Sequence, residues 1–342
     1  MNINSAADRL LPCLLALLAL TGGWACRSDQ APEHLLRASV IVAESHTWYR
    51  ALEHFGELLD ERTDGRIRLQ IYPSEQLAKE IEAIRMIQAG VIDMTTTSAL
   101  LSNWTEIMTF CEMPFLLDSM EEADEMLNGP VGARIRDEMI EKTGLRPVAY
   151  FQAGPRHLTS NRPIRHPDDL QGLVVRIPSV PAFITAWDAL GAKTTPIAFS
   201  EVFTSLQQGV INAQENPLPL TNMLALYEVQ EYVNLTAHNF GWTYPVIGEK
   251  QFRAMAPDLQ TIFLECAREM QVYERKLFDE NDARARAELE ARGMKFVEVD
   301  REAFKQKHGN AIYRTLSPRM QAGNEQRWNY LPMVGSWNCR SF

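Results

Sequence analysis

The feature that most constrains the fold is a regular alternation of strand-like and helix-like segments early in the chain. Residues 35–43 and 66–73 are short runs rich in aliphatic and β-branched side chains, as in strands. Residues 47–65 and 74–90 carry apolar side chains at helical spacing, and each ends at a glycine. A third strand-like run follows at 91–98. This β-α-β-α-β order is typical of a parallel sheet covered by helices, so the sequence predicts an α/β fold.

A second set of alternating segments runs from residue 145 to residue 214. After it, residues 257–292 form a long stretch with helical spacing and many Glu and Arg side chains, and a short strand-like run follows at 294–299. The sequence contains no internal repeat, low-complexity tract or flexible linker that would separate the two sets. We therefore expect two α/β lobes joined by crossing strands, with a late helix long enough to span both.

The first 25 residues are expected to be a signal peptide. An apolar run at 10–20 follows Arg9 and is too short to cross a bilayer as a stable helix, but it fits the hydrophobic region of a secretory signal. The segment before Cys26 is similar to a lipoprotein signal, in which Cys26 would be lipidated. Ordinary cleavage after Ala25 is the alternative, and both imply export from the cytoplasm.

Composition and motifs exclude several classes of function. The 342 residues are 46% hydrophobic and carry a net charge of −10, which opposes binding to nucleic acid. No phosphate-binding glycine motif, nucleophile elbow or metal-binding helix is present, and the histidines never occur in ligand spacing. The few cysteines are widely spaced and indicate neither a disulfide framework nor a zinc site. We expect no cofactor, no metal and no nucleic-acid partner.

Three polar residues stand in apolar strand ends and turns, namely Arg156, Arg176 and Asn216. Ligands of open α/β sheets bind beyond the carboxyl ends of the strands, and Arg176 ends such a strand just before Pro178. The planar fork of arginine binds a carboxylate with two hydrogen bonds. Two convergent arginines would therefore make a site for an organic acid. From spacing alone, an internal ion pair is the alternative for each of them.

The residues around these positions resemble a known family. Residues 156–218 are similar to the core of the extracytoplasmic solute-binding proteins of tripartite ATP-independent periplasmic (TRAP) transporters, the DctP family. Residues 63–98 and 112–123 resemble the first lobe of the same proteins. The resemblance implies a two-lobed, periplasmic-binding-protein-like fold that closes on its ligand. It assigns lobe 1 to residues 32–153 plus 242–281, and lobe 2 to 154–241 plus 282–342.

The resemblance also implies the residues of the binding site. Arg176 matches the signature arginine that holds the ligand carboxylate, and Arg156 matches a second arginine that supports it. Asn216, from the Gln-Glu-Asn-Pro motif, and the aromatic ring of Phe199 would lie beside the ligand. Serine at position 98, where sialic-acid binders tend to have an acidic residue, argues against sialic acid. Four positions that vary with the substrate would line the cleft: Glu80, Ser98, Ser179 and Trp242.

The resemblance implies a periplasmic protein that captures an organic acid and delivers it to the small and large membrane subunits of a TRAP transporter. A dicarboxylate, a sugar acid and other carboxylates all remain open as the ligand. Two alternatives belong to other classes. One is a binding protein that serves a signalling receptor, and the other is an enzyme acting on a carboxylated substrate, with His157 and Glu215 as the only ionisable neighbours of the arginines in the sequence. We expect a binding protein and not an enzyme.

Overall fold

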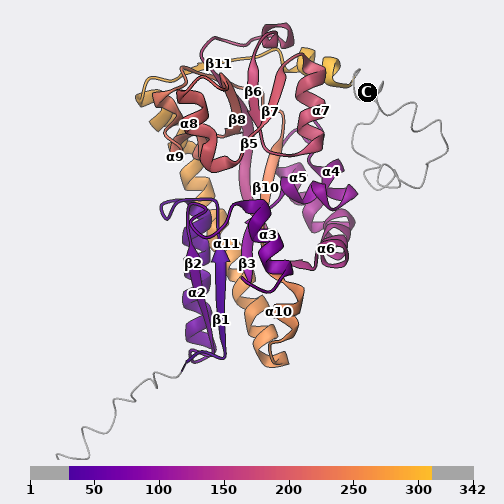
Figure 1. The fold of residues 1–342 in the computed structure, drawn as a ribbon, viewed down its shortest axis with the longest axis vertical. Helices are drawn as coiled ribbons and strands as arrows, with labels where there is room; N and C mark the ends of the chain where they lie inside the picture. Colours follow the sequence, from indigo (N-terminus) through magenta and orange to yellow (C-terminus); the bar gives the residue numbers. More distant parts are fainter. Residues whose placement is uncertain (1–30, 310–342) are drawn as a thin grey trace, which may run out of the picture.

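The computed structural model describes residues 31–309 and shows an elongated molecule with two lobes stacked along its long axis (Figure 1). The first lobe is built mainly from residues 31–147, and the second mainly from residues 161–236. Strands and helices alternate in both lobes, so the predicted α/β architecture is confirmed. Two strands and one long helix pass from one lobe to the other.

The elements of the first lobe are β1 (His34–Ser39), α2 (Thr47–Arg62), β2 (Ile67–Tyr72), α3 (Glu80–Gln88), β3 (Met94–Thr97), η1 (Ala99–Asn103), α4 (Glu106–Cys111), α5 (Met120–Asn128), α6 (Pro130–Thr143), β4 (Leu145–Pro147) and α10 (Glu249–Arg253). Those of the second lobe are η2 (Pro167–Leu170), β6 (Val174–Ile177), α7 (Pro181–Leu190), β7 (Lys193–Pro196), η3 (Phe199–Glu201), α8 (Val202–Gln207), β8 (Ala213–Pro217), α9 (Leu218–Met223), η4 (Leu226–Glu228), β9 (Tyr232–Asn234) and β11 (Lys295–Val297). The shared elements are β5 (Phe151–Ser160), β10 (Phe240–Gly248) and α11 (Pro257–Ala291). Residues 301–309 form a further helix.

Helix α2 shows how local sequence sets these elements. Its N-cap is His46, whose imidazole Nδ1 accepts a hydrogen bond from the backbone N–H of Trp48 at 3.2 Å. The apolar side chains of Leu52, Phe55 and Leu59 recur at helical spacing and are fully buried. The chain leaves the helix through Gly65, whose φ of +80° favours glycine. The predicted helix over 47–65 is therefore confirmed, with its last turn unwound.

Each lobe contains the same three-stranded parallel unit. The strand order across the sheet is β2-β1-β3-β10-β5-β8-β6-β7, so β1 and β6 lie at the centres of two matching units. One side-chain hydrogen bond is also equivalent in the two units. The Asp93 side chain accepts from the backbone N–H of Arg37 at 2.8 Å, and the Asn212 side chain accepts from that of Val174 at 2.8 Å. The structure thus contains an internal repeat that the sequence does not reveal, because the two units share backbone geometry and few side chains.

The two lobes are joined by the antiparallel strands β5 and β10. The first half of β5 pairs with β10, and its second half, from Arg156 to Ser160, pairs with β8. Strand β10 pairs with β5 up to Thr243 and with β3 from Tyr244 onward. The register shifts between Gly241 and Trp242, which marks a β-bulge at the junction of the lobes. The crossing strands predicted from the sequence are therefore present.

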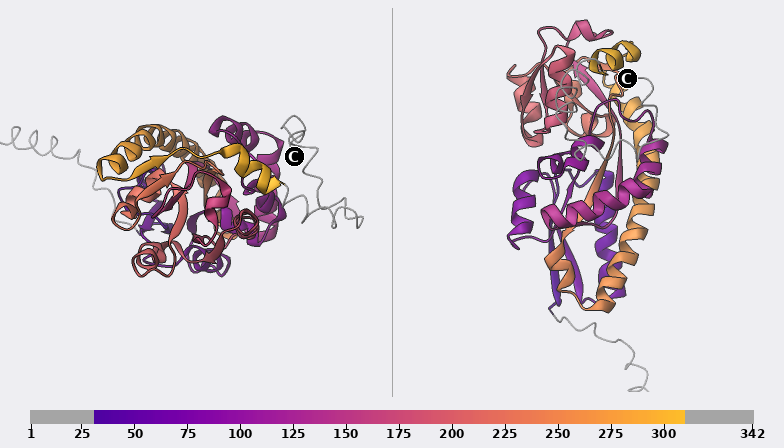
Figure 2. Two further views of the ribbon diagram at one scale, coloured as in Figure 1. Left: turned by 90° about the horizontal axis from the view of Figure 1, so that it is seen from above. Right: turned by 90° about the vertical axis from the view of Figure 1, so that its right-hand side faces the viewer.

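Helix α11 is the third connection and spans 35 residues. In its first half Phe263 and Met270 pack with α2 in the apolar core of the first lobe, while Ala285 and Leu289 in its second half pack against residues of α9 and β9 in the second lobe. Figure 2 shows the helix, in orange, running along one side of the molecule past both lobes. This helix matches the predicted late helix that spans both lobes.

The structure does not test some of the predictions made from the sequence. The signal peptide at 1–25 and Cys26 lie outside the described residues, as does the segment 310–342 of the predicted second lobe. The boundaries at 153 and 241 also stay predictions. Within residues 31–309, none of the helices has both the length and the apolar character needed to cross a membrane.

Candidate ligand-binding site

Arg176 is a buried cation without an internal counter-charge in contact with it. It lies at the end of β6 with only 3% of its surface exposed. Its Nε and Nη2 groups both donate to the carbonyl oxygen of Ile197, at 2.8 and 2.6 Å. Among the residues that the structure describes, no carboxylate lies within ion-pairing distance of this guanidinium. Burial lowers the pKa of Arg176 to about 10, so it remains charged at neutral pH.

Arg156, in contrast, has an internal partner. Its Nε donates to Oε2 of Glu215 at 2.5 Å, and its Nη2 donates to Oε1 at 2.8 Å. The Nε2 atom of His238 lies 2.9 Å from the same Oε2. Although burial raises the pKa of Glu215, the charge and hydrogen bonds of Arg156 outweigh it and lower this pKa to about 2. Of the two alternatives that the sequence leaves open, the internal ion pair therefore holds for Arg156 and not for Arg176.

Asn216 and Phe199 lie next to the arginines through defined contacts. The Asn216 side chain accepts from Nη2 of Arg156 at 3.0 Å and donates to Gln214 at 2.6 Å, so its amide is held at both ends. Phe199 begins η3 two residues after Ile197, the acceptor for Arg176. The ring of Phe199 packs against the apolar core of the first lobe, although its own backbone belongs to the second.

Glu80 approaches the arginines from the other lobe. It is the first residue of α3, and its Oε1 accepts from the hydroxyl of Thr97 at 2.7 Å. The backbone N–H of Ser98 also donates to this carboxyl. Burial raises the pKa of Glu80 to about 7, and the nearby charge of Arg176 opposes the rise. Glu80 of the first lobe thus lies close enough to Arg176 of the second to interact with its charge.

Ser179 and Trp242 occupy different surroundings. Ser179 follows β6, and its backbone oxygen accepts from the Asn103 side chain of the first lobe at 3.0 Å. Trp242 lies on β10, is 2% exposed and packs edge to face with Tyr244 in an apolar core of the first lobe. No hydrogen bond or ion pair joins Trp242 to the other predicted site residues in the described part of the chain. The structure therefore brings Arg156, Arg176, Asn216 and Glu80 together more closely than it does Trp242.

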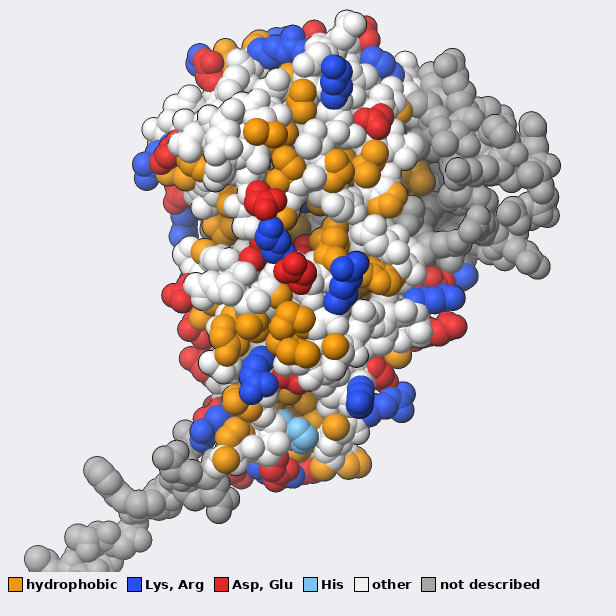
Figure 3. All heavy atoms as spheres, viewed as in Figure 1, with side chains coloured by type: hydrophobic (Ala, Val, Ile, Leu, Met, Phe, Trp, Pro, Cys, Tyr) orange, Lys and Arg blue, Asp and Glu red, His pale blue; other side chains and the backbone are white. Residues whose placement is uncertain are grey.

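The lobes also touch through charged groups at the surface. Lys79 of the first lobe pairs with Glu201 of the second at 2.7 Å. Asp118 of the first lobe pairs with Arg301 at 2.7 Å and with Lys305 at 2.8 Å. Figure 3 shows blue and red side chains close together at the waist between the lobes. The predicted site therefore lies between two lobes that are in direct contact.

Sequence reasoning missed part of this network. The sequence identifies Glu215 only as an ionisable neighbour of the arginines, and it singles out neither His238 nor Glu112. Glu112 is 3% exposed and lies close enough to Arg156 and Glu215 to feel their charges. Its sequence signal is a charged residue in the otherwise apolar run Phe110 to Leu117. A single such residue is a weak signal, because the residues that surround it, such as Arg156 and Glu215, are far away in the sequence.

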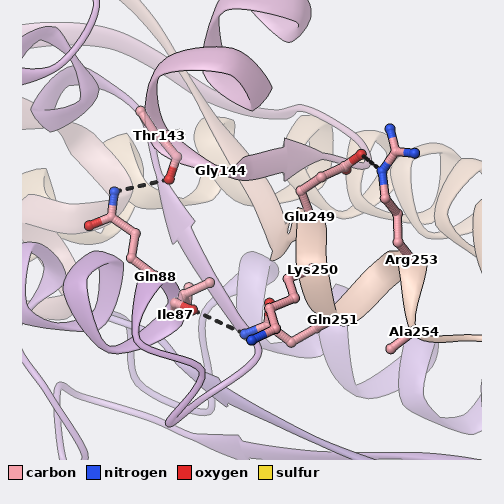
Figure 4. A pocket seen from close by; sticks show the side chains of 9 residues that line it. All are labelled: Ile87, Gln88, Thr143, Gly144, Glu249, Lys250, Gln251, Arg253 and Ala254. Carbon is pink, nitrogen blue, oxygen red and sulfur yellow. Dashed lines mark hydrogen bonds and ion pairs between the residues drawn. The ribbon is translucent and has the colours of Figure 1, made fainter.

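A surface hollow of about 660 Å³ lies elsewhere, on the first lobe (Figure 4). Its polar side chains are largely bonded to neighbours, for example Gln88 Nε2 to the carbonyl oxygen of Thr143 at 2.9 Å. None of the predicted ligand contacts lines it, so we do not assign the ligand to it. The lining residues are Ile87, Gln88, Thr143, Gly144, Glu249, Lys250, Gln251, Arg253 and Ala254.

Comparison with known families decides the classification. Residues 38–317 match the family described as bacterial extracellular solute-binding protein, family 7 (DctP). The chain belongs to this family. The predicted family and the predicted function in solute binding for a TRAP transporter are thereby confirmed, and family members are periplasmic proteins. Among the side chains that the structure describes, no group of three or more His, Cys, Asp and Glu residues is arranged to hold a metal ion.

Individual members of the DctP family are similar over most of their length. A solute-binding protein of Roseobacter denitrificans is 42% identical over 90% of this chain and 94% of its own length. The crystal structure of a TRAP periplasmic solute-binding protein from that organism, with bound L-galactonate, has a TM-score of 0.82 at 42% identity and covers 88% of this chain and 100% of its own. A second structure, from Sulfitobacter with bound β-D-galacturonate, has a TM-score of 0.81 at 26% identity and covers 84% of this chain and 97% of its own. The 2,3-diketo-L-gulonate-binding periplasmic protein of Escherichia coli is 30% identical over 81% of this chain and 85% of its own length. These likenesses confirm the predicted two-lobed fold.

Proposed function

We propose that this DctP-family protein captures a sugar acid between its two lobes and that Arg176 binds the carboxylate of the ligand. The observation that carries the proposal is the unneutralised, buried guanidinium of Arg176. A buried charge is costly unless it is paired, and its Nη1 group donates to no other described residue. A ligand carboxylate would supply both the counter-charge and the missing acceptor.

The proposed ligand class follows from the relatives and from the polar groups near Arg176. L-galactonate, β-D-galacturonate and 2,3-diketo-L-gulonate, which the relatives' names and structures specify, each combine one carboxylate with hydroxyl groups. Glu80 of the first lobe is suited to hydroxyl groups, because a carboxyl group with a pKa of about 7 can accept or donate a hydrogen bond near neutral pH. A second ligand carboxylate beside Glu80 would be repelled when Glu80 is ionised. We therefore favour a sugar acid over a dicarboxylate.

Arg156 has a supporting role in this proposal. Glu215 already neutralises it, and Asn216 fixes its orientation. It can therefore contribute hydrogen bonds to the ligand while adding little net charge. The ligand would favour the closed form, since Arg176 and Glu80 lie on different lobes and reach the same molecule only when the lobes meet.

Delivery to the small and large membrane subunits completes the proposed function. The protein would release its ligand chemically unchanged to these subunits, whereas an enzyme would convert the ligand into a product. Anchoring through lipidated Cys26 is the alternative to a freely diffusing periplasmic form. Mass spectrometry of the mature N-terminus separates these two forms, and incubation with the bound acid followed by chromatography detects any turnover.

Titration calorimetry with L-galactonate tests the role of Arg176. Replacing Arg176 by alanine should weaken binding by at least about 2 kcal/mol, or roughly 30-fold, because a charged hydrogen-bonding partner is lost. Arg176→Lys should also weaken binding, because an ammonium group cannot form the paired hydrogen bonds of a guanidinium. Arg85→Ala, at an exposed position of α3, is the matched control. Full affinity in Arg176→Ala would refute the proposal.

A further inference from the structure

Glu112 is a buried carboxyl group that the proposed function has not used. It follows α4 in the first lobe and is 3% exposed. Its Oε1 atom has no hydrogen-bond partner among the residues that the structure describes. Burying a polar atom without a partner is unfavourable, so such an atom requires an explanation. The side chain is too deeply buried for bulk water to provide one.

The neighbours of Glu112 place it beside the ligand-binding residues. The Asn239 side chain lies near the Glu112 carboxyl and lowers its pKa, and the backbone oxygen of Asn239 accepts from the N–H of Arg156 at 2.8 Å. Glu112 also interacts electrostatically with Arg156, Glu215 and Glu80. A short chain of contacts thus links Glu112 of the first lobe to the arginine side of the site.

The same segment is anchored directly on the second lobe. The backbone N–H of Phe115 donates to the carbonyl oxygen of His238 at 2.6 Å. Phe115 has a φ of +62°, which is rare and unfavourable for a bulky side chain, and its ring is buried with residues of the second lobe. The backbone strain is therefore compensated by contacts between the lobes. With the lobes in contact, the position of Glu112 is fixed relative to Arg156.

The protonation state of Glu112 limits what it can bind. Burial raises its pKa to about 8, and the charge of Arg156 only partly opposes this rise. At pH 7 the carboxyl group is therefore mainly uncharged. An uncharged carboxyl group can donate one hydrogen bond and accept others, which suits an alcohol. A cationic ligand group would be repelled by Arg156.

We propose that Glu112 binds a hydroxyl group of the ligand and so selects acids that are hydroxylated next to the carboxylate site. The proposal rests on the proposed function, in which Arg176 holds the carboxylate. Glu112 contributes this contact from the first lobe, and Arg176 acts from the second. A ligand that carries both groups would therefore hold the lobes together, whereas an acid without the hydroxyl would be held mainly by one lobe.

Titration calorimetry with L-galactonate and a set of analogues, each lacking one hydroxyl, tests this contact. Glu112→Leu keeps a similar volume but removes the polar atoms, and it should weaken L-galactonate binding by about tenfold or more. Glu112→Gln retains a donor and an acceptor and should stay within about threefold of the wild type. Glu112→Ala is a second test if the leucine variant does not fold. Glu141→Leu, at an exposed position of α6, is the matched control.

The analogues show whether the contact is direct. For the analogue that lacks the hydroxyl bound by Glu112, wild type and Glu112→Leu should bind with equal affinity, whereas the other analogues should show the loss. Unchanged affinity for L-galactonate in Glu112→Leu, or an equal loss for every analogue, would overturn the proposal. The proposed function fails separately, if Arg176→Ala binds as well as wild type. A third outcome is that acids without hydroxyl groups bind, that Arg176→Ala weakens their binding, and that sugar acids do not bind. In that case the Glu112 proposal and the preference for sugar acids fail, while the role of Arg176 stands.

Discussion

Replacing Glu215 by glutamine should destabilise the whole protein, because this buried carboxylate neutralises Arg156 and contacts His238. Glutamine has a similar shape but no charge, so the Arg156 guanidinium, whose side chain is 15% exposed, would lose its counter-charge in a largely buried position. Breaking a buried ion pair from one side costs about 3–5 kcal/mol. The lowering of the Glu215 pKa from 4.5 to about 2 corresponds to about 3 kcal/mol, in agreement with that range. We expect a loss of about 3 kcal/mol in the free energy of unfolding.

Urea denaturation followed by tryptophan fluorescence measures this loss, and Glu141→Gln at the surface of α6 is the control. The dependence on pH gives a second check. Because the folded-state pKa of Glu215 lies below its unfolded value, its contribution is complete above about pH 4.5 and is lost as the pH falls toward 2. The difference between wild type and Glu215→Gln should therefore shrink over that interval. A difference below about 1 kcal/mol at pH 7 would refute the reasoning.

Two further changes probe the junction between the lobes. Gly154 has a φ of +81°, and a Cβ added there would lie 3.1 Å from Cζ of Phe278 on α11. Gly172 has a similar φ of +80°, but a Cβ added there would have no atom within 4 Å. Gly154→Ala should therefore lower the melting temperature more than Gly172→Ala, and equal effects would show that the contact with α11 is unimportant. Glu274 on α11 is buried, and its pKa is raised by burial to about 8, so the folded state loses stability as pH rises from about 4.5 to 8. Glu274→Gln should therefore be more stable than wild type at pH 8 and lose this advantage near pH 4.5, and melting curves that show the same difference at both values would contradict this.

The local part of the fold could be predicted from the sequence because it depends on neighbours in the chain. Apolar side chains at helical spacing define α2, and glycines mark where the helices end. The antiparallel pairing of β5 with β10 joins residues about 90 positions apart, such as Pro155 and Phe240. Its existence could be anticipated from the absence of a linker, but its register and bulge could not, because nothing local in either strand specifies the partner.

The candidate site likewise has residues that could be predicted from local sequence and residues that could not. Arg176 could be identified because a charge at the end of an apolar strand is conspicuous in one short segment. The ion pair of Arg156 with Glu215 could not be assigned, since register across β5 and β8 decides which residues meet. Glu112 was missed for the same reason, because its surroundings come from segments that are far apart in the sequence. Asn216, like Arg176, could be identified as a polar residue in an apolar turn, whereas only the resemblance to known proteins supplied Phe199.

The path of the chain through both lobes has a consequence for the order in which the protein can fold. Strand β3 ends at Thr97, but its partner on the far side, β10, begins only at Phe240. During synthesis the first lobe therefore emerges with one edge of its parallel unit unpaired, and it must wait until the second lobe and β10 have followed. The packing of α11 against α2 comes later still. No amino-terminal fragment that ends before β10 contains a complete first lobe, so the native state of each lobe becomes accessible only when nearly the whole chain has been made.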